Sequence, residues 1–558
     1  MTPADLTRAI FVSVSEIAEQ RRAAGVQIST TPSLDEIVLE RPRMREHGDW
    51  ATNAAMRFGK AFGMPPRDLA AAIAESLGSV PGVSAVDVAG PGFLNVRLDA
   101  AAAGALAKTI VEAGAAYGRT SALAGGQRIN LEFVSANPTG PLHIGHTRWA
   151  ALGDALARVL RAAGADVANE YYINDAGEQM HRFAESVYAA AAGEPTPEGG
   201  YPGSYIADLA ARVLEREPGL LALPRPEGTT LAREIAYEIQ LAEIRDSLER
   251  FRVHFDVWTS ERRLHAVDAD GTSEIDRSIA RLRVQGHVFD DGDAVWVRTT
   301  DFGDDKDRVI RKSDGQFTYF AADAAYYLDK GDRGFGHKIY LLGADHHGYV
   351  HRLKALAGAA GDDPARDLEV LIGQLVDVDG ARLSKRAGNI IEMNDLMEWL
   401  GVDALRYTLA RYPADSPLSL NPAQLRSRTN DNPVFTVQYA HARTCAVARN
   451  AADAGVDRST FAPELLGHET EAALLGALSD LPRVVAHAAE LREPHRVARY
   501  LEEVASLYHK WYDSCRVMPF GDEVVGDLHR TRLWLNDAAG QTIRNGLELL
   551  GVSAPERM

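Results

Sequence analysis

The sequence predicts an α/β protein in which a doubly wound parallel sheet is flanked by an N-terminal α+β module and a C-terminal helical bundle. Between about 121 and 400, short apolar strand candidates alternate with helical patterns. Residues 1–120 mix helical patterns with short β-like segments, and the chain after about 400 is almost wholly helical in pattern. The 558 residues exceed what one core can organise, so roughly three or four domains are expected.

The composition is that of an ordinary soluble globular protein, with 46% hydrophobic and 25% charged residues. No apolar run approaches the roughly 20 residues that span a bilayer, and the N-terminus lacks a secretory pattern. A cytoplasmic protein without membrane contact is therefore expected. Cys445 and Cys515 lie far apart and no CxxC pair occurs. We expect both to be buried apolar residues and predict neither a disulfide framework nor a structural zinc site.

The formal net charge of −18 argues against an unspecific nucleic-acid coat, since affinity for the phosphate backbone needs clustered Lys and Arg. A local basic face is still possible. Between Ala404 and Arg449, arginines at positions 406, 411, 426, 428, 443 and 449 stand against two acids, Asp415 and Asp431. An acidic protein with one basic side is the prediction.

The strand candidates of the central sheet are 130–134, 169–173, 338–342 and 368–371, and functional sites should lie at their carboxyl ends. The interval from about 186 to 300 breaks this rhythm with a Pro/Gly-rich patch, two helical runs and a strand-like segment at 294–298. We interpret it as an insertion between the two halves of the sheet. The predicted units are then 1–120, 121–400 with the insertion, and 401–558.

The most informative segment is 137–146, which follows the first of these strand candidates and opens a long Ala-rich helical run. Pro138, Gly140 and Pro141 predict a tight turn. His143 and His146 would then project from one face of the new helix, where free N–H groups and the helix dipole favour anions. Gly145 lets another group approach the backbone closely. The segment predicts a triphosphate site.

A helix cap or half of a metal site would also explain His-x-x-His, but the Pro/Gly turn before it favours the nucleotide site. A P-loop is excluded on different grounds. The nearest Gly-rich loop, at 114–120, lacks the required lysine.

Segment 143–146 resembles the HIGH signature of class I aminoacyl-tRNA synthetases, and 132–143 is similar to arginyl-tRNA synthetases in particular. The resemblance implies a Rossmann-like, HIGH-type nucleotide-binding catalytic domain. It also implies that His143 and His146 are catalytic, stabilising the attack of an amino-acid carboxylate on the α-phosphate. The ATP-binding residues that it implies in this segment are Pro138, Gly140, His143, Gly145 and His146.

A second element, 380–389, is a basic, glycine-bounded loop that follows a strand-like segment. Without context, such a loop is usually a solvated surface. In this order along the chain it resembles the KMSKS loop of the class, with Arg382 at the first lysine and Arg386 at the final serine. The resemblance assigns Lys385 to catalysis on the pyrophosphate side, and Arg382, Ser384 and Lys385 to ATP binding.

A site for arginine must satisfy a planar guanidinium, which bidentate carboxylates and flat aromatic rings distinguish from the ammonium of lysine. Tyr319 and Asp323 are four residues apart in a helical pattern, hence on one helix face. A partly exposed helix position would also explain them. The segment resembles the arginine-recognition helix of the family, and Glu132 and Asn137 match family positions that hold the polar groups of the amino acid.

Two further segments are expected near the nucleotide, and the first of them, 343–349, resembles the family. Gly343, Asp345 and His346 are expected at ATP or its ribose, with His346 standing where many relatives carry glutamine. Asp345 and His346 with the next histidine could suggest a metal cluster, but no compact set of further ligands follows, and no metal site is predicted. Gln374 is expected to offer backbone groups to adenine, although a buried sheet edge would look the same.

The tRNA contacts are expected at both ends of the chain. Residues 1–120 resemble the N-terminal additional domain of arginyl-tRNA synthetases, which contacts the D-arm or elbow, with Phe93 and Asn95 as candidates. Segment 432–443 and the C-terminal 551–558 resemble the anticodon-binding helical domain. Aromatic and basic residues there suit single-stranded RNA, although core positions at helical spacing are the plainer interpretation. The candidates in this segment are Phe435, Gln438, Tyr439 and Arg443.

The family resemblance therefore implies ligation of L-arginine to tRNA(Arg) with ATP, accompanied by Mg²⁺, and no tightly bound cofactor. It also implies that activation of arginine needs bound tRNA, and a monomer is expected. Two rivals remain open. One is a HIGH-type ligase that adenylates an acid without tRNA, and the other is a catalytically silent tRNA-binding paralogue.

Overall fold

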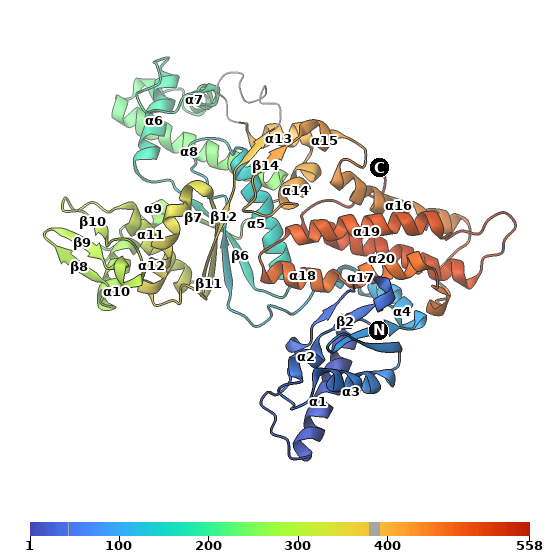
Figure 1. The fold of residues 1–558 in the computed structure, drawn as a ribbon. Helices are drawn as coiled ribbons and strands as arrows, with labels where there is room; N and C mark the ends of the chain where they lie inside the picture. Colours follow the sequence, from blue (N-terminus) through green and yellow to red (C-terminus); the bar gives the residue numbers. More distant parts are fainter. Residues whose placement is uncertain (43, 379–390) are drawn as a thin grey trace.

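The computed structural model describes residues 1–42, 44–378 and 391–558 (Figure 1). Its centre is a five-stranded sheet in the order β12-β11-β5-β6-β7, in which every neighbouring pair is parallel. The strands are β5 (Ile129–Glu132), β6 (Val167–Ile173), β7 (Val257–Ser260), β11 (His337–Gly343) and β12 (Leu368–Gly373). The predicted α/β class and the four predicted strands are confirmed. Parallel pairing brings the carboxyl ends of all five strands to one edge.

Helix α5 (Ile144–Ala162) connects β5 to β6 and carries the histidine motif at its start. Most of its residues are buried, as expected of a helix that packs against a sheet and against further helices. It lies unusually close to the end of β5, because a Cβ on Gly153 would fall 2.3 Å from the ring of Phe133. Glycine at this position lets the helix approach the turn that precedes it.

Two lobes grow out of the sheet (Figure 1). The chain between β6 and β7 forms a helical lobe with its own core: α6 (Gly177–Ala191), α7 (Ser204–Arg216), η4 (Leu220–Ala222) and α8 (Arg225–Arg250). The chain between β7 and β11 forms the second lobe. Its elements are α9 (Glu261–His265), α10 (Glu274–Val284), β8 (Val288–Asp291), β9 (Ala294–Val297), η5 (Thr299–Phe302), β10 (Arg308–Arg311) and α11 (Tyr319–Asp332). Strand β7 lies within 186–300, so the chain returns to the sheet inside the interval predicted as one insertion.

The N-terminal part is an α+β unit whose four-stranded sheet has the order β1-β2-β4-β3 and whose core is separate from the others. Its elements are α1 (Pro3–Ala23), η1 (Leu34–Glu36), β1 (Leu39–Glu40), η2 (Arg45–His47), β2 (Trp50–Thr52), α2 (Ala54–Phe58), α3 (Pro66–Gly78), β3 (Val83–Ala89) and β4 (Phe93–Leu98). Helix α4 (Ala100–Ala113) and η3 (Gly114–Ala116) lead from it to the central sheet.

Between β11 and β12 lie η6 (Ala344–Tyr349) and α12 (Val350–Ala360). After β12, the chain is mainly helical, as predicted. Its elements there are β13 (Val376–Val378), α13 (Met393–Leu400), α14 (Val402–Ala410), β14 (Leu418–Leu420), α15 (Pro422–Arg426), α16 (Pro433–Asp453), η7 (Pro463–Leu465), α17 (Glu469–Ser479), α18 (Leu481–Glu490), α19 (His495–Ser514) and α20 (Asp527–Leu549).

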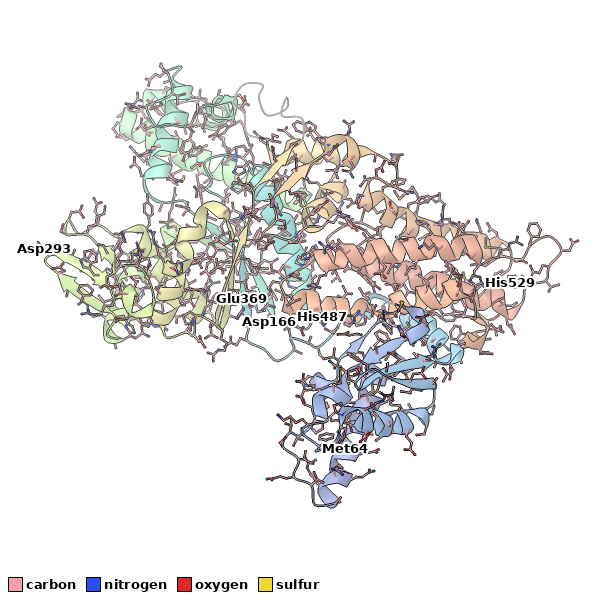
Figure 2. The ribbon with its side chains drawn as sticks, in the orientation of Figure 1. Met64, Asp166, Asp293, Glu369, His487 and His529 are labelled. Atoms are coloured by element: carbon pink, nitrogen blue, oxygen red, sulfur yellow. The ribbon has the colours of Figure 1, made fainter. Side chains whose placement is uncertain are left out.

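One hydrophobic core runs without interruption from the parallel sheet into these helices. A polar clamp joins the two parts at the outer strand of the sheet. Glu369 of β12, labelled in Figure 2, accepts hydrogen bonds from Arg492, at 2.7 and 3.0 Å, and lies 2.9 Å from the Nε2 atom of His337. The helical bundle is therefore fixed relative to the parallel sheet.

The predicted basic side between 404 and 449 is only partly correct. Arg406 is completely buried and pairs with Asp154 of α5, and Arg411 binds Glu502 at 2.6 Å. These two arginines join helices and do not add to a surface. The expectation for the cysteines is also partly wrong, because Cys515 is buried whereas Cys445 is only half-buried.

Across the ranges that the structure describes, no helix combines the length and the apolar character needed to cross a membrane.

Candidate active site

The turn after β5 has a strained backbone. Val134 and Ser135 have φ values of 67° and 41°, in the left-handed region that non-glycine residues rarely adopt. The Ser135 hydroxyl holds the turn by donating to Oε1 of Glu132 at 3.1 Å and accepting from the backbone N–H of Tyr172 at 3.1 Å. The sharp change of direction thus occurs before Pro138, Gly140 and Pro141, which the sequence identified as the turn.

His143 is the N-cap of α5, so the predicted helix start is confirmed. The rings of His143 and His146 stack with centroids 3.8 Å apart. The Nδ1 atom of His143 accepts from the backbone N–H of Gly145 at 3.1 Å, and Nδ1 of His146 accepts from that of His143 at 3.3 Å. Since each Nδ1 acts as an acceptor, the proton of each neutral ring is on Nε2.

Both histidines are neutral at physiological pH. Burial lowers the pKa of His143, and burial together with the neighbouring ring of His143 lowers the pKa of His146 to about 3. The pair can therefore donate two hydrogen bonds from Nε2 without introducing a positive charge. Gly145 keeps this arrangement compact, because a Cβ there would lie 3.1 Å from Cε1 of His143.

Residues 391–393 are fastened to the histidine motif. The backbone N–H of Ile144 donates to the carbonyl of Ile391 at 3.1 Å, and that of Met393 donates to the carbonyl of Leu142 at 2.7 Å. The KMSKS-like segment ends just before this contact in the sequence. Its candidates Arg382, Ser384 and Lys385 lie outside the described residues.

Asp323 of α11 is the centre of an acidic site at the carboxyl edge of the sheet. Burial and the nearby carboxylates of Glu261 and Glu132 raise its pKa to about 7, although Tyr349 donates a hydrogen bond to it. Tyr319 begins the same helix and its side chain is 69% exposed. Tyr319 and Asp323 thus lie on one helix as predicted, with the carboxyl of Asp323 half-buried and the ring of Tyr319 open to solvent.

Glu261 is a site residue that sequence reasoning missed. It is buried at the start of α9, directly after β7, and it hydrogen-bonds Tyr172 of β6. Strand β7 is short and lies in the interval interpreted as an insertion, so the position after a sheet strand was not recognised. The polar end of that strand was the available signal.

Both carboxylate oxygens of Glu132 already have a partner within the protein. Its Oε2 lies 2.6 Å from Nζ of the fully buried Lys330, while Oε1 accepts from Ser135. Lys330 was not identified from the sequence either. Asn137 lies nearby on the turn, and its amide donates to Oε1 of Gln179 at 2.6 Å.

The remaining nucleotide candidates differ in outcome. Gly343 ends β11 beside Gly373 of β12, and Asp345 and His346 follow in η6, at the carboxyl edge of the sheet as predicted. The backbone groups of Gln374 already have partners within the protein. Its N–H donates to the carbonyl of Ala414 at 2.9 Å and is thus not available to adenine, and its own carbonyl accepts from Arg148 at 2.8 Å.

The candidate tRNA surface lies on α16. The rings of Phe435 and Tyr439 stack almost in parallel, with centroids 5.8 Å apart, and Tyr439 is 37% exposed. The guanidinium of Arg443 lies 4.7 Å from the rings of both Tyr439 and Tyr512. Flat rings interleaved with a cation are the surface expected for unstacked bases.

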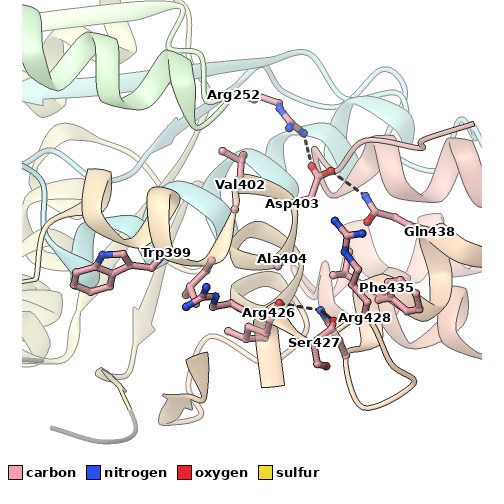
Figure 3. A pocket seen from close by; sticks show the side chains of 15 residues that line it. Arg252, Trp399, Val402, Asp403, Ala404, Arg426, Ser427, Arg428, Phe435 and Gln438 are labelled. Atoms are coloured by element: carbon pink, nitrogen blue, oxygen red, sulfur yellow. Dashed lines mark hydrogen bonds and ion pairs between the residues drawn. The ribbon is translucent and has the colours of Figure 1, made fainter. Parts of the chain in front are cut away.

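An open pocket of about 560 Å³ adjoins this surface (Figure 3). Arg252, Arg426 and Arg428 line it together with the flat rings of Trp399 and Phe435. Asp403 also lines the pocket and pairs with Arg252 at 2.6 Å, so Arg426 and Arg428 supply its net positive charge.

Two of the predicted tRNA contacts are buried inside the protein. Gln438 is buried, and its amide donates to Asp403 and to the carbonyl of Ser553, both at 2.9 Å. Asn95 is buried in β4 between its neighbouring strands. Phe93, at the start of the same strand, is 40% exposed and remains available.

Within the described residues, no group of three or more His, Cys, Asp and Glu side chains is placed so that it could hold a metal ion.

Three family models match the chain in the order of its structural units. Residues 13–98 match the arginyl tRNA synthetase N terminal domain, residues 109–189 and 234–406 match the catalytic domain of tRNA synthetases class I (R), and residues 437–558 match the DALR anticodon binding domain.

Relatives and solved structures agree with these models. The arginine–tRNA ligase of Paenarthrobacter aurescens is 61% identical over 558 residues, and that of Pseudarthrobacter chlorophenolicus is 60% identical over 564, in both cases across the full length of both chains. A crystal structure described as an arginyl-tRNA synthetase from Campylobacter jejuni has a TM-score of 0.73 at 31% identity, covering 83% of this chain and all of that one. The arginyl-tRNA synthetase of Thermus thermophilus shares the fold, with a TM-score of 0.72 at 21% identity, covering 99% of this chain and all of that one.

The parallel sheet, the stacked histidines at the start of α5 and the catalytic-domain match together define a class I aminoacyl-tRNA synthetase. The full-length similarity decides the amino acid. The chain belongs to the arginine–tRNA ligase family.

Proposed function

We propose that the protein attaches L-arginine to the 3′-terminal ribose of tRNA(Arg) at the expense of ATP. The carrying observation is that a half-buried acidic site around Asp323 and the two neutral histidines of α5 flank the same edge of the parallel sheet. A cluster of carboxyl groups suits a cationic amino acid. Neutral donors at a helix N-terminus suit the phosphates of ATP.

The reaction has two steps. An oxygen of the arginine carboxylate attacks the α-phosphorus of ATP, the bond to the β,γ-phosphates breaks, and pyrophosphate leaves. A terminal ribose hydroxyl of the tRNA then attacks the carbonyl carbon of arginyl-adenylate, loses its proton, and AMP leaves. Neither step needs a strong acid or base, so positioning and charge stabilisation can supply most of the rate.

The two Nε2–H groups of His143 and His146 support the first step as donors to the phosphate oxygens on which charge builds up. Pro138, Gly140 and Gly145 would let the triphosphate approach the backbone. Lys385, with Arg382 and Ser384, is proposed to hold the pyrophosphate side, on the basis of sequence resemblance alone. Gly343, Asp345 and His346 are proposed at the adenosine.

Asp323 and Glu261 are the best candidates for the guanidinium, because each can present two carboxylate oxygens to its planar fork. Tyr319 is proposed to close over the guanidinium as a stacking ring, which its present exposure permits. Asn137 would hold the polar groups of the α-carbon. Glu132 would act beside it with the oxygen that Lys330 does not occupy.

The tRNA is proposed to contact the N-terminal unit, residues 1–120, through Phe93, and the helical unit, residues 401–558, through Phe435, Tyr439 and Arg443. Between these units lies the catalytic unit, residues 121–400. The arginine-lined pocket beside α16 supports this proposal, because it offers cations for phosphates next to flat rings for bases.

We further propose that Mg²⁺ enters with the phosphates of ATP, as it does in many nucleotide-dependent enzymes, and that the protein itself contributes no dedicated cage for it. The enzyme is proposed to act as a monomer. A cytoplasmic location is proposed because charged tRNA is consumed by ribosomes.

The test is charging of bulk tRNA with each amino acid in turn, by the wild type and by Asp323→Ala. Only arginine should be attached by the wild type, and the variant should lose arginine charging while remaining folded. Attachment of another amino acid, or unchanged charging by the variant, would refute the assignment. A ligase that ignores tRNA and an inactive tRNA-binding protein would both give no charged product with the wild type.

The dependence of arginine activation on tRNA is tested separately by pyrophosphate exchange. Exchange should require both arginine and tRNA. Strong arginine-dependent exchange without tRNA would remove that part of the proposal and leave the ligase reaction intact.

A further inference from the structure

Lys330 is a fully buried lysine on the helix that carries Tyr319 and Asp323. It follows Asp323 by seven residues, so the two side chains lie on the same side of α11, two turns apart. Its ammonium lies 2.6 Å from Oε2 of Glu132, 3.9 Å from the ring centroid of Tyr340 and 4.3 Å from that of Tyr326. A lysine is rarely buried without a specific partner, and this one has a carboxylate and two aromatic faces.

The Lys330–Glu132 pair compensates part of the repulsion between two carboxylates that the sheet places side by side. Glu132 of β5 and Glu170 of β6 are direct neighbours in the parallel register, so their side chains leave the same face of the sheet. Two buried carboxylates side by side repel each other and each needs a counter-charge. Helix α11 and its C-cap supply both, Lys330 for Glu132 and Arg333 for Glu170, to which Arg333 donates twice at 2.9 Å.

The Lys330–Glu132 pair also reaches the strained turn before the histidine motif. With Oε2 held by Lys330, Oε1 of Glu132 accepts from the hydroxyl of Ser135, whose φ is 41°. Ser135 in turn accepts from the backbone of Tyr172. A continuous chain of polar contacts therefore connects the helix of the arginine site to the turn that leads to His143.

We propose that Lys330 is a positioning residue for arginine activation, which neutralises Glu132 and, through Ser135, holds the turn that leads to the ATP site. Guanidinium recognition is then left to Asp323 and Glu261, whose carboxylates are not paired with Lys330. The inference rests on the proposed function, because it assumes that arginine binds at Asp323.

The charges around Glu132 decide how its carboxylate behaves when Lys330 is removed. The titratable and charged groups that face it come from five parts of the structure. They are Asp323, Tyr326, Lys330 and Arg333 from α11 and its C-cap, Glu170 and Tyr172 from β6, Tyr340 from β11, Glu261 from α9, and Tyr349 from η6. Among them only Lys330 pairs with Glu132 as a cation, and Arg333 is bound to Glu170. Without Lys330, a buried carboxylate among other acids would be neutralised by a proton instead.

Lys330→Met removes the charge and keeps the length of the side chain. Its kcat/KM for arginine should fall by at least about tenfold near pH 8, as small misplacements of reacting groups produce. The ratio of variant to wild-type activity should rise as the pH is lowered towards about 6, because protonation of Glu132 replaces the lost ammonium. A loss caused by general destabilisation would not depend on pH in this way.

The double variant E132Q/K330M removes both buried charges and leaves an amide oxygen to accept from Ser135. It should lose less activity than the two single losses would give in combination, and its ratio to the wild type should be flat with pH. It also provides the test if Lys330→Met alone does not fold, since replacement of both members of a buried pair is tolerated far better than removal of one. Lys330→Arg should keep the charge and fall between wild type and Lys330→Met.

Lys338 is the matched control. It is a buried lysine on β11 that pairs with Asp362 at 2.5 Å and lies 4.9 Å from the ring of Tyr327, and its register partner on β5 is Asn130, not Glu132. Lys338→Met should lower the melting temperature but leave the kinetics for arginine and their pH dependence unchanged.

The proposal is overturned if the ratio for Lys330→Met does not change with pH, or if the losses of E132Q and K330M simply add in the double variant. Wild-type charging of tRNA with arginine in the same assay distinguishes a failure of the proposed function from a failure of the role proposed for Lys330. If the wild type does not charge arginine, the proposed function fails. If it does, the outcome concerns Lys330 alone.

Discussion

His143 and His146 stack at 3.8 Å, and each ring accepts a backbone hydrogen bond at Nδ1. This relationship fixes the proton of both neutral rings on Nε2, and the lowered pKa values keep both rings neutral. The motif thus acts as a pair of oriented donors whose positions are set by the first turn of α5. A cationic pair at this spacing would repel itself.

The first prediction concerns the charge state of His146. His146→Ala should lower kcat by roughly 100- to 1,000-fold, the cost of one transition-state donor. His146→Asn should recover part of this loss, since an amide is also a neutral donor. Because the pKa of His146 is lowered to about 3, kcat at saturating arginine should show no titration of this residue between about pH 6 and 8. An acidic limb near pH 6.5 that disappears in the Asn variant would contradict neutral donation.

The second prediction concerns Asp323. Its pKa is raised to about 7, so protonated carboxyl accumulates as the pH falls below that value, and the protonated form cannot pair with a guanidinium. The kcat/KM for arginine should therefore fall by up to about tenfold per pH unit on the acid side. Arginine binding should release about half a proton near pH 7 and close to one proton at lower pH, measurable by calorimetry in buffers of different ionisation enthalpy.

Asp323→Asn is the control for this pH dependence. It should lower kcat/KM for arginine by at least about 100-fold, because the site then lacks the charged partner of the guanidinium. Its remaining activity should be nearly independent of pH over the same interval. Persistence of the acidic limb in this variant would assign the titration to another group, and Glu261 would be the first candidate.

The organisation of the fold could be predicted because strands of the parallel sheet are apolar runs bounded by turn residues, and the helical part keeps one periodicity over long stretches. Strand β7 could not be recognised in the same way. Only two of its four residues are apolar, and it lies between the helices α8 and α9 in the sequence. Glu261 was missed for this reason, because its place in the site depends on where β7 pairs.

The surroundings of single polar residues could not be predicted for a different reason. Gln374 and Gln438 hydrogen-bond partners far away in the sequence, and Asn95 is buried within β4. Resemblance of a segment does not reveal such tertiary partners. Lys330 illustrates the converse, since nothing in a helical pattern marks a lysine that will be buried against a glutamate 198 residues earlier.

The third prediction compares two neighbours on α16. Tyr439 is partly exposed and stacked on Phe435, whereas Gln438 is buried and bonded to Asp403. Tyr439→Ala should raise the KM for tRNA by roughly tenfold, within the range for one stacked base, and leave the melting temperature nearly unchanged. Gln438→Ala should lower the melting temperature and change the KM for tRNA less. The reverse pattern would exclude Tyr439 from the tRNA surface.

The fourth prediction concerns the buried joint between the catalytic unit and the helical unit. Arg406 of α14 is fully buried, binds Asp154 of α5, and donates to the carbonyl of Phe251 at 2.7 Å and to that of Leu550 at 3.1 and 3.2 Å. Arg406→Met should destabilise the fold by roughly 3–5 kcal/mol, because it leaves Asp154 as a buried carboxylate with less compensation and several carbonyls unpaired. Denaturant unfolding measures this loss.

The packing at this joint allows an independent test of the same contact from the opposite side. Gly551 has a φ of +65°, and a Cβ there would fall 2.0 Å from Nη2 of Arg406. Gly551→Ala should therefore displace the Arg406 guanidinium and destabilise the protein, while Gly455→Ala, at a φ of +72° with open space around its Cβ position, carries only the backbone strain. The difference between the two alanine variants isolates the arginine contact. Equal losses of stability would mean that the Arg406 joint yields without cost, and the large effect predicted for Arg406→Met would then be wrong as well.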